Sequence, residues 1–221
     1  MSKGSNPENT HAGLLITFEG PEGSGKTTLI RNLSKHLTAK GCDPYILREP
    51  GGTEIGERIR NILLDPASSG MCSETELLLM EASRAQLVRE KIIPALDAGM
   101  IILCDRFADA SVAYQGAGRG LGVAQVERFN DFALGGLEPD LTFLCLLPPQ
   151  EGKARLADRH KDRLDQEAMA FHQRVFEAYQ QMANSGKARF AVITASAPPA
   201  EMLHQALAQL KRLEHGLLKY L

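Results

Sequence analysis

The sequence lacks the features that direct a protein to a membrane or to nucleic acid. No apolar run approaches the ~20 residues that a membrane-spanning helix needs, so we expect no membrane role. The formal net charge is only -2 at pH 7, which provides no overall attraction to nucleic acid. Any anion that the protein binds must therefore meet a local group of cations.

Cysteine is scarce, and its placement gives no indication of a metal site built on thiolates. The four cysteines are Cys42, Cys72, Cys104 and Cys145. They lie far apart and without metal-ligand spacing. We expect reduced thiols in a cytoplasmic protein.

The remaining composition is that of an ordinary globular protein. With 221 residues, of which 43% are apolar and 24% charged, the chain is long enough for one large α/β domain and short for two. Residues 1–12 are polar and lack the apolar core of a secretion signal, so we expect a disordered leader there. A single domain is then expected over residues 13–221.

Short apolar runs alternate with longer amphipathic stretches from Leu14 onward. This alternation predicts an α/β fold in which a five-stranded parallel sheet carries helices on both faces. The expected strands are 14–18, 45–48, 100–104, 141–147 and 189–193. The expected helices are 27–40, 54–64, 74–98, 123–134, 167–183 and 200–220. Pro94 predicts a kink or an early end of the third helix near Ile93.

The clearest motif follows the first expected strand and opens a helix. Residues 20–27 read Gly-Pro-Glu-Gly-Ser-Gly-Lys-Thr, which matches a Walker A loop in spacing and context and indicates a P-loop NTPase fold. Its glycines let successive backbone N–H groups face one anion at a helix N-terminus. Lys26 is expected to reach the β and γ phosphates of ATP, and the Thr27 hydroxyl to hold Mg²⁺. The alternative is a glycine-rich turn followed by an ordinary lysine.

The loop itself leaves the reaction open, because GTPases, motor ATPases and small-molecule kinases share it. Glu22 narrows the choice, since a carboxylate beside bound phosphates is repelled unless it serves a metal or a hydroxyl of a second ligand. A solvated loop acid is the alternative for this residue. The loop residues expected to bind ATP are Gly20, Glu22, Gly23, Ser24, Gly25, Lys26, Thr27 and Thr28.

A second group of polar residues follows the expected strands 45–48 and 100–104. Residues just past the carboxyl ends of parallel strands lie at the ligand crevice of such sheets. Asp105 is thus placed to act on Mg²⁺ through water, and Arg106 and Arg48 to bind the phosphate of an acceptor. The alternative for Asp105 and Arg106 is a surface pair without function.

These motifs together resemble a known family. The stretches FEGPEGSGKTT, REPGGTEIGERIR, DRFADASVAYQGAGRGL and PDLTFLCL are similar to those of bacterial thymidylate kinases (dTMP kinases), which are P-loop nucleoside-monophosphate kinases. The resemblance covers nearly the whole chain from Leu14 onward. The P-loop occurs in many unrelated NTPases, whereas REPGGT and the DR-aromatic stretch with AYQG and GRG are specific to this family.

The resemblance implies how the phosphate, sugar and base carbonyl of an acceptor nucleotide are bound. Glu22 is expected to meet the deoxyribose 3′-hydroxyl, while Arg48 and Arg106 bind the monophosphate. Arg84 is expected to hydrogen-bond the thymine carbonyl. Without the family, Arg84 is simply an arginine on a largely apolar helix, with the alternative that its charged end extends from the edge of the core into solvent.

Further acceptor contacts follow from the same resemblance. Ser111 and Gln115 are expected to touch the base or phosphate edge, and Tyr114 to crowd the sugar 2′ position so that ribonucleotides fit poorly. One position departs from the family pattern, because many members carry a phenylalanine where Met80 stands, followed here by Glu81. Methionine can still cover the face of a pyrimidine ring through its polarizable sulfur.

The arginine-rich stretch KARLADRHKDRLD, residues 153–165, resembles the lid of the thymidylate kinase subclass that carries its catalytic arginines there. We place the lid at residues 151–166. Arg155, Arg159 and Arg163 are the candidates to fold over ATP, with Arg159 and Arg163 expected to bind it and Arg163 preferred as the catalytic arginine. The alternative is a solvated basic helix face.

The implied reaction transfers the γ-phosphoryl group of MgATP to the 5′-phosphate of dTMP, giving dTDP and ADP in dTTP biosynthesis. ATP and Mg²⁺ are the expected cofactors, with Thr27 and Asp105 at the metal. The acceptor phosphate, with a second pKa near ~6, is already ionised at neutral pH, so no strong general base is needed. The expected catalytic residues are Lys26, Arg106, Arg163 and Glu22. The resemblance also implies a homodimer packed through helices.

Two other classes of function remain open from the residues. One is a P-loop kinase for another deoxynucleotide or nucleoside. The other is a regulatory P-loop NTPase, which predicts a guanine-recognising Asn-Lys-x-Asp run that the sequence does not contain. An adapter without catalysis would not need the Lys26-Thr27 pair.

Overall fold

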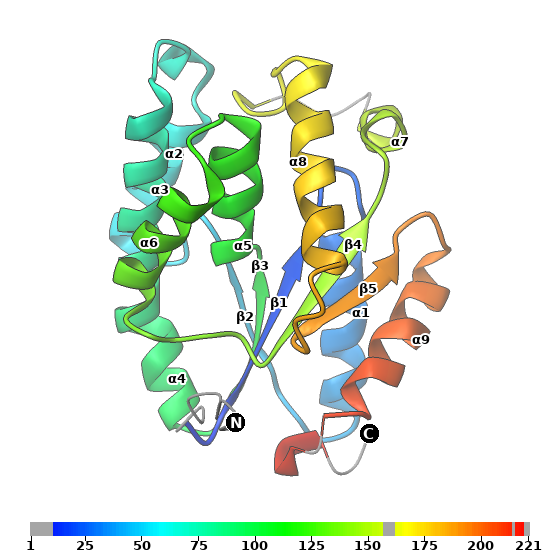
Figure 1. Ribbon diagram of the computed structural model, residues 1–221. Coiled ribbons are helices and arrows are strands. Elements are labelled where there is room, and N and C mark those ends of the chain that lie inside the picture. The colour runs from blue at the N-terminus through cyan, green and yellow to red at the C-terminus, as the bar shows by residue number, and fades with distance from the viewer. Residues whose placement is uncertain (1–10, 157–161, 214, 219–221) are drawn as a thin grey trace, which may run out of the picture.

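The structure is a computed structural model that describes residues 11–156, 162–213 and 215–218. The described residues form a five-stranded sheet with strand order β2-β3-β1-β4-β5, and all neighbouring strands are parallel (Figure 1). The strands are β1 (Leu14–Glu19), β2 (Tyr45–Arg48), β3 (Ile101–Asp105), β4 (Leu141–Leu146) and β5 (Phe190–Thr194). The predicted parallel sheet is confirmed, with strand ends displaced by at most one residue.

Helices occupy most of the chain between the strands. The α-helices are α1 (Lys26–Ala39), α2 (Glu54–Leu64), α3 (Ser73–Leu87), α4 (Ile93–Asp97), α5 (Ala108–Ser111), α6 (Val123–Leu134), α7 (Pro149–Arg155), α8 (Met169–Ala183) and α9 (Pro199–Leu210). The other helical segments are the 3₁₀ turns η1 (Pro66–Ser68) and η4 (Gly216–Leu218) and the π-helical segments η2 (Val88–Ile92) and η3 (Val112–Gly118).

Both faces of the sheet are covered by helices. Successive strand side chains point to opposite faces, and apolar side chains on both faces must be buried. Leu14 and Phe18 pack with α1 and α9 on one face. Leu15 packs with the α3–η2–α4 segment on the other face. Leu144 packs with α8 on that second face (Figure 1). The predicted layer order of helix, sheet and helix is therefore confirmed.

The carboxyl ends of three adjacent strands meet at one edge of the sheet. Asp105 at the end of β3 pairs in register with Phe18 of β1 and with Arg48 of β2. The loop after Glu19 and the polar residues after β2 and β3 therefore start side by side. Ligands bind at this edge in open parallel sheets.

The third helix is irregular, but it does not end early. Instead of a single helix over 74–98, α3 passes into the π-helical turn η2, and α4 then carries Pro94 in its first turn. Proline lacks the N–H for an intrahelical bond, and its ring crowds the preceding turn. The wider turn therefore precedes Pro94, slightly earlier than the kink expected at Ile93.

Two further helix predictions differ from the structure. The last helix ends at Leu210 rather than at residue 220, because Leu218 folds back onto the core beside α9. The segment 108–118, which had no predicted helix, forms α5 and η3. Its glycines and small residues give no amphipathic period, and it is helical because it packs between α6 and α8.

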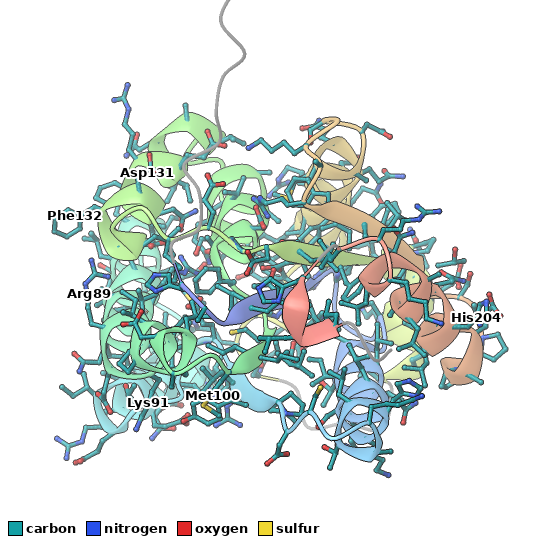
Figure 2. All side chains as sticks on the ribbon, turned by 90° about the horizontal axis from the view of Figure 1, so that it is seen from below. Arg89, Lys91, Met100, Asp131, Phe132 and His204 are labelled. Atoms are coloured by element: carbon teal, nitrogen blue, oxygen red, sulfur yellow. The ribbon has the colours of Figure 1, made fainter. Side chains whose placement is uncertain are left out.

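The surface carries a few exposed apolar side chains. Phe132 on α6 is 84% exposed and projects from the body of the protein (Figure 2).

No helix among residues 11–156, 162–213 and 215–218 is long and apolar enough to span a membrane. All four cysteines are free thiols. The expected leader lies outside the described residues except for His11 and Ala12. His11 Nδ1 lies within hydrogen-bond distance of Asp97 Oδ1, at 2.6 Å.

Candidate active site

A cavity of about 570 Å³ opens at the carboxyl edge of the sheet. It is bounded by the P-loop, the residues that follow β2 and β3, one face of α3, and the segment α5–η3. The predicted site residues that line it are Glu22, Gly23, Ser24, Gly25, Lys26, Thr27, Thr28, Arg48, Met80, Arg84, Asp105, Arg106, Ser111, Tyr114 and Gln115. The fold thus brings the two predicted groups of residues to one space.

The P-loop curls because three of its glycines adopt positive φ angles. These angles are 140° at Gly20, 73° at Gly23 and 84° at Gly25. A β-carbon at Gly20 would collide with the carbonyl oxygen of Cys145, and one at Gly23 with the carbonyl oxygen of Gly152. Only glycine fits these positions without strain, so the curled loop at the start of α1 requires this sequence.

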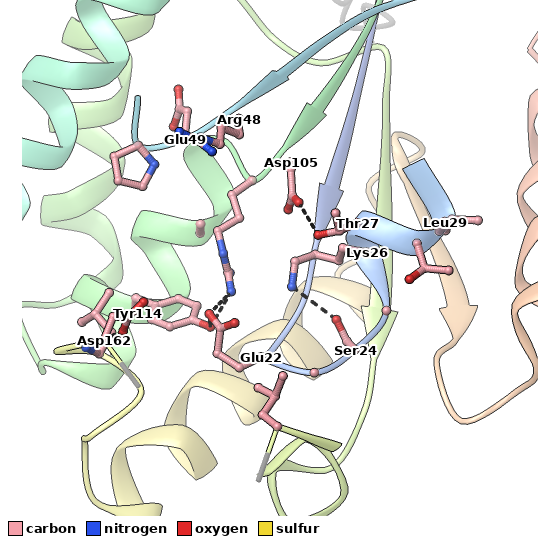
Figure 3. A pocket seen from close by; sticks show the side chains of 18 of the residues that line it. Glu22, Ser24, Lys26, Thr27, Leu29, Arg48, Glu49, Asp105, Tyr114 and Asp162 are labelled. Atoms are coloured by element: carbon pink, nitrogen blue, oxygen red, sulfur yellow. Dashed lines mark hydrogen bonds and ion pairs between the residues drawn. The ribbon is translucent and has the colours of Figure 1, made fainter. Parts of the chain in front are cut away.

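Lys26 lies inside the curl of the loop. Its Nζ donates to the carbonyl oxygens of Gly20 and Pro21, each 2.9 Å away, and to Ser24 Oγ at 3.3 Å (Figure 3). Burial and the nearby charge of Arg106 lower the pKa of Lys26. The three hydrogen bonds hold the ammonium group beside the loop's backbone N–H groups, which form the expected anion site.

Thr27 and Asp105 form a pair suited to Mg²⁺. The Thr27 hydroxyl donates to Asp105 Oδ2 across 2.9 Å (Figure 3). The part of the chain that the structure describes contains no group of three or more His, Cys, Asp or Glu side chains able to hold a metal ion. One hydroxyl and one carboxylate fit the coordination preference of Mg²⁺. This ion usually binds few protein ligands and completes its coordination shell with water and phosphate oxygens.

Arg106 connects the P-loop with the acceptor side of the cavity. Its guanidinium donates to Glu22 of the loop, to the Tyr114 hydroxyl at 2.9 Å and to the Gly20 carbonyl at 3.1 Å. The guanidinium also lies 4.7 Å from the centre of the Tyr114 ring. Its backbone has a φ of 68°, a strained angle for a non-glycine residue. The chain accepts this strain at the point where the side chain enters the cavity.

Glu19, which the sequence analysis missed, holds the turn that carries Arg106. It accepts hydrogen bonds from the backbone N–H groups of Phe107 and Ala110, at 2.7 and 3.2 Å, and from the Tyr179 hydroxyl at 2.9 Å. Burial, and to a smaller extent the charge of Asp109, raise the pKa of Glu19 to about 8. A glutamate that ends the mostly apolar run LLITFE was the available signal.

Arg84 is buried rather than extended into solvent. Only 2% of the residue is exposed, and each of its three nitrogens donates to protein. The acceptors are Glu49 Oε2, Glu81 Oε1, Ser111 Oγ, Asn130 Oδ1 and the Phe107 carbonyl. Burial raises the pKa of Glu49 to about 7, although the charge and the hydrogen bonds of Arg84 act to lower it. A base carbonyl at Arg84 must share or replace one of these hydrogen bonds.

Two arginines approach the acceptor side from β2 and α2. Arg48 is half-exposed and forms a 2.8 Å ion pair with Glu57. Arg60 also lines the cavity, and its Nη1 donates to the Pro50 carbonyl at 2.8 Å. Arg60 was not predicted, although it lies two residues after Arg58 in the quoted stretch REPGGTEIGERIR.

The described arginines of the predicted lid lie in two different places. Arg155 lines the cavity and donates to the carbonyl oxygens of Gly23 and Ala195, at 3.2 and 3.0 Å. Arg163, the preferred catalytic arginine, does not line the cavity. Its side chain is buried and bound to Glu76 instead. Arg159 lies outside the described residues.

The family is decided by comparison with known proteins. The family model for thymidylate kinase matches residues 18–207. The chain belongs to the thymidylate kinase family. A thymidylate kinase from Desulfovibrio desulfuricans is 45% identical over 216 residues, covering 92% of this chain and 100% of the relative. Another, from Bacillus pumilus, is 44% identical over 199 residues, covering 89% and 94%.

The resemblance seen in the sequence is thus confirmed. This thymidylate kinase family member brings the P-loop, the Arg48 and Asp105 motifs and the face of α3 around one cavity. Of the lid arginines in the described residues, it brings Arg155 to the cavity and leaves Arg163 outside. The partners of Arg163 come from α2 and α3.

Proposed function

We propose that the chain is an ATP-dependent dTMP kinase that transfers the γ-phosphoryl group of MgATP to the 5′-phosphate of dTMP, giving dTDP and ADP. The observation that carries this proposal is the position of Arg106. Its guanidinium binds Glu22 of the donor loop and Tyr114 of the acceptor side at once. A cation at that junction suits a reaction that brings two polyanions together.

The donor half of the cavity fits a nucleoside triphosphate. The backbone N–H groups of the loop and the N-terminus of α1 provide an anion site, and Lys26 adds a positive charge to it. The Thr27 hydroxyl and the Asp105 carboxylate would hold Mg²⁺ directly or through water. When bound, Mg²⁺ neutralises part of the charge on the β and γ phosphates.

The acceptor half fits a nucleoside monophosphate. Arg106, Arg48 and Arg60 supply cations for its phosphate. Glu22 of the loop pairs with Arg106, and we expect it to accept from the 3′-hydroxyl. The Tyr114 ring would lie against the sugar. The base would then meet Met80 and Arg84 on α3 and Ser111 and Gln115 on the α5–η3 segment, all of which line the cavity.

Transfer in this site requires positioning and charge stabilisation rather than a base. The acceptor phosphate has a second pKa near ~6, so one of its oxygens is already ionised at neutral pH. That oxygen forms the new P–O bond, the bond between the γ-phosphorus and the bridging oxygen breaks, and ADP leaves with the electron pair. Lys26, Arg106 and Arg155 would stabilise the charge that spreads over the transferred group.

Exposed apolar side chains on three helices support a homodimer. Ile55 and Ile62 on α2, Leu78 on α3 and Phe132 on α6 are exposed apolar residues. These helices are packed neighbours, with α3 between α2 and α6. Exposed apolar side chains on neighbouring helices are of the kind that mediates self-association. We propose that two copies pack through them in the cytoplasm.

The proposed reaction is tested by a coupled assay of ADP release. The purified chain is given MgATP with dTMP, dCMP, dAMP, dGMP or UMP, and Lys26→Met serves as the control for activity of this site. We expect acceptor-dependent ADP release that is fastest with dTMP and is lost in Lys26→Met. Release that does not depend on the acceptor would indicate an NTPase, and a faster reaction with another acceptor would indicate a different kinase.

A further inference from the structure

A buried carboxylate on α3 lies at the centre of a hydrogen-bond network beside the cavity. Glu76 is 1% exposed. It accepts from Gln115 Nε2 at 2.7 Å, from Arg119 Nε and Nη2 at 3.1 and 2.8 Å, and from Arg163 Nη2 at 2.6 Å. Burial alone would raise the pKa of Glu76, but the hydrogen bonds from Arg119, Gln115 and Arg163 hold it below its usual value. The group is therefore ionised at neutral pH.

An ionised carboxylate fixes which end of the Gln115 amide faces it. A carboxylate only accepts hydrogen bonds, so the amide NH₂ must point to Glu76 and the amide oxygen must point elsewhere. Gln115 lines the cavity. Among the described residues, no group donates to its amide oxygen, although its nitrogen is bound to Glu76. Glu76 takes one of the two hydrogens on this nitrogen, and the Gln115 oxygen is the acceptor left on the side away from Glu76.

We propose that Glu76 is a positioning residue for base selection, because it turns the Gln115 amide so that the cavity accepts a pyrimidine with a ring N–H and disfavours cytosine. The proposal rests on the proposed function. Thymine and uracil carry a hydrogen on N3, which can donate to the Gln115 oxygen. Cytosine has a lone pair on N3, which would meet that oxygen without a hydrogen between them.

The two arginines keep Glu76 in its charged form and are themselves anchored. Arg163 Nε also donates to the Leu63 carbonyl at 2.8 Å, and Arg119 Nη1 lies 2.6 Å from Glu167. A neutral Glu76 could donate a hydrogen bond, and the amide of Gln115 could then turn over. The end of the lid that carries Arg163 thus contributes to base selection, although Arg163 does not reach the cavity.

A purely structural role for Glu76 makes a different prediction. The network joins α3, η3 and the chain before α8, so its loss would lower stability and slow every acceptor alike. A positioning role instead changes the ratio of the kcat/KM values for the different acceptors. It also acts mainly on the KM for the monophosphate, because the base makes the same contacts before and during transfer.

The test compares Glu76→Gln with wild type by kcat/KM for dTMP, dUMP and dCMP. Glutamine has the same size but no charge, and its NH₂ can donate to a turned Gln115. We expect the preference for dTMP over dCMP to fall about tenfold or more, as for a site that leaves a buried polar group unpaired. Glu167→Gln removes a carboxylate from Arg119 but leaves Glu76 in place, and it should keep the wild-type preference.

A substitution at a buried position can reduce folding, so Gln115→Leu provides a second test. This variant keeps Glu76 and removes the amide, and the same loss of preference is expected. An unchanged dTMP to dCMP ratio in either folded variant overturns the proposal. Equal losses of kcat/KM for all three acceptors also overturn it. Wild-type enzyme that does not use dTMP would refute the proposed function instead.

Discussion

The hydroxyl of Thr27 donates to the carboxylate of Asp105 across 2.9 Å, although the two residues are 78 positions apart in the chain. The bond joins the first turn of α1 to the carboxyl end of β3 (Figure 3). It exists because β1 and β3 are neighbours in the sheet, so that the loops after them start side by side. We expect this pair to determine how the site uses Mg²⁺.

Thr27→Val keeps the shape of the side chain and removes the hydroxyl. We expect kcat/KM for MgATP to fall and the Mg²⁺ concentration for half-maximal activity to rise by about 10- to 100-fold. The measurement is a Mg²⁺ titration of initial rates at saturating dTMP. Thr38→Val, on an exposed position of the same helix, is the matched control. An unchanged Mg²⁺ titration in Thr27→Val would exclude the hydroxyl from the metal site.

Arg155→Ala removes the lid arginine that lines the cavity. We expect kcat to fall by about 10³-fold with little change in the KM for ATP, because a cation that faces the transferred group acts mainly in the transition state. Steady-state kinetics with both substrates measures this split. A variant with wild-type kcat would show that Arg155 does not stabilise the transition state.

Arg163→Ala should act on stability more than Arg155→Ala does. Its side chain is buried and bound to Glu76 and the Leu63 carbonyl, so we expect a loss of about 2 kcal/mol in the free energy of unfolding. Urea unfolding of both variants gives the comparison. If Arg163→Ala instead lost turnover at wild-type stability, the result would support the catalytic role that the sequence predicts for Arg163.

Met80→Phe introduces the phenylalanine that the family resemblance led us to expect at this position. A phenylalanine ring stacks on a base more strongly than a methionine sulfur does, so we expect the KM for dTMP to fall about two- to fivefold while kcat stays nearly constant. Steady-state kinetics at saturating ATP measures it. Leu78→Phe, on the exposed side of α3, is the control. A higher KM would mean that the cavity has no room for the ring.

Glu19→Gln removes a titrating group but keeps an acceptor for the Phe107 and Ala110 N–H groups. With its pKa raised to about 8 by burial and by Asp109, the folded state holds a proton that the unfolded state loses near pH ~4.3. Wild-type stability therefore falls as pH rises between these values, by up to about 1.4 kcal/mol per pH unit.

The pH dependence of urea unfolding tests this assignment. We expect Glu19→Gln to have a flatter profile than wild type from about pH 5 to about pH 8. Glu127→Gln, on an exposed position of α6, should keep the wild-type profile. A slope in Glu19→Gln equal to that of wild type would show that another group titrates in this range.

Local signals predicted most of the fold and many of the residues that line the cavity. The alternation of apolar runs gave the five strands, because side chains buried on both faces of a parallel sheet must be apolar. The P-loop was recognised because its glycines are needed for a backbone that no other residue adopts at Gly20 and Gly23. The helical segment 108–118 was missed because tertiary packing, not amphipathic period, makes it helical.

The amino-acid sequence by itself determined the order of strands and helices along the chain, the curled loop before Lys26 and the family, since each depends on residues that are close in sequence. Only the tertiary structure decided the partners of the charged side chains. It bound Arg163 to Glu76, 87 positions away, and brought Arg155 to the cavity. The physical reason is that a long arginine side chain binds whichever carboxylate or carbonyl the packed helices bring within reach, and sequence spacing does not fix that distance.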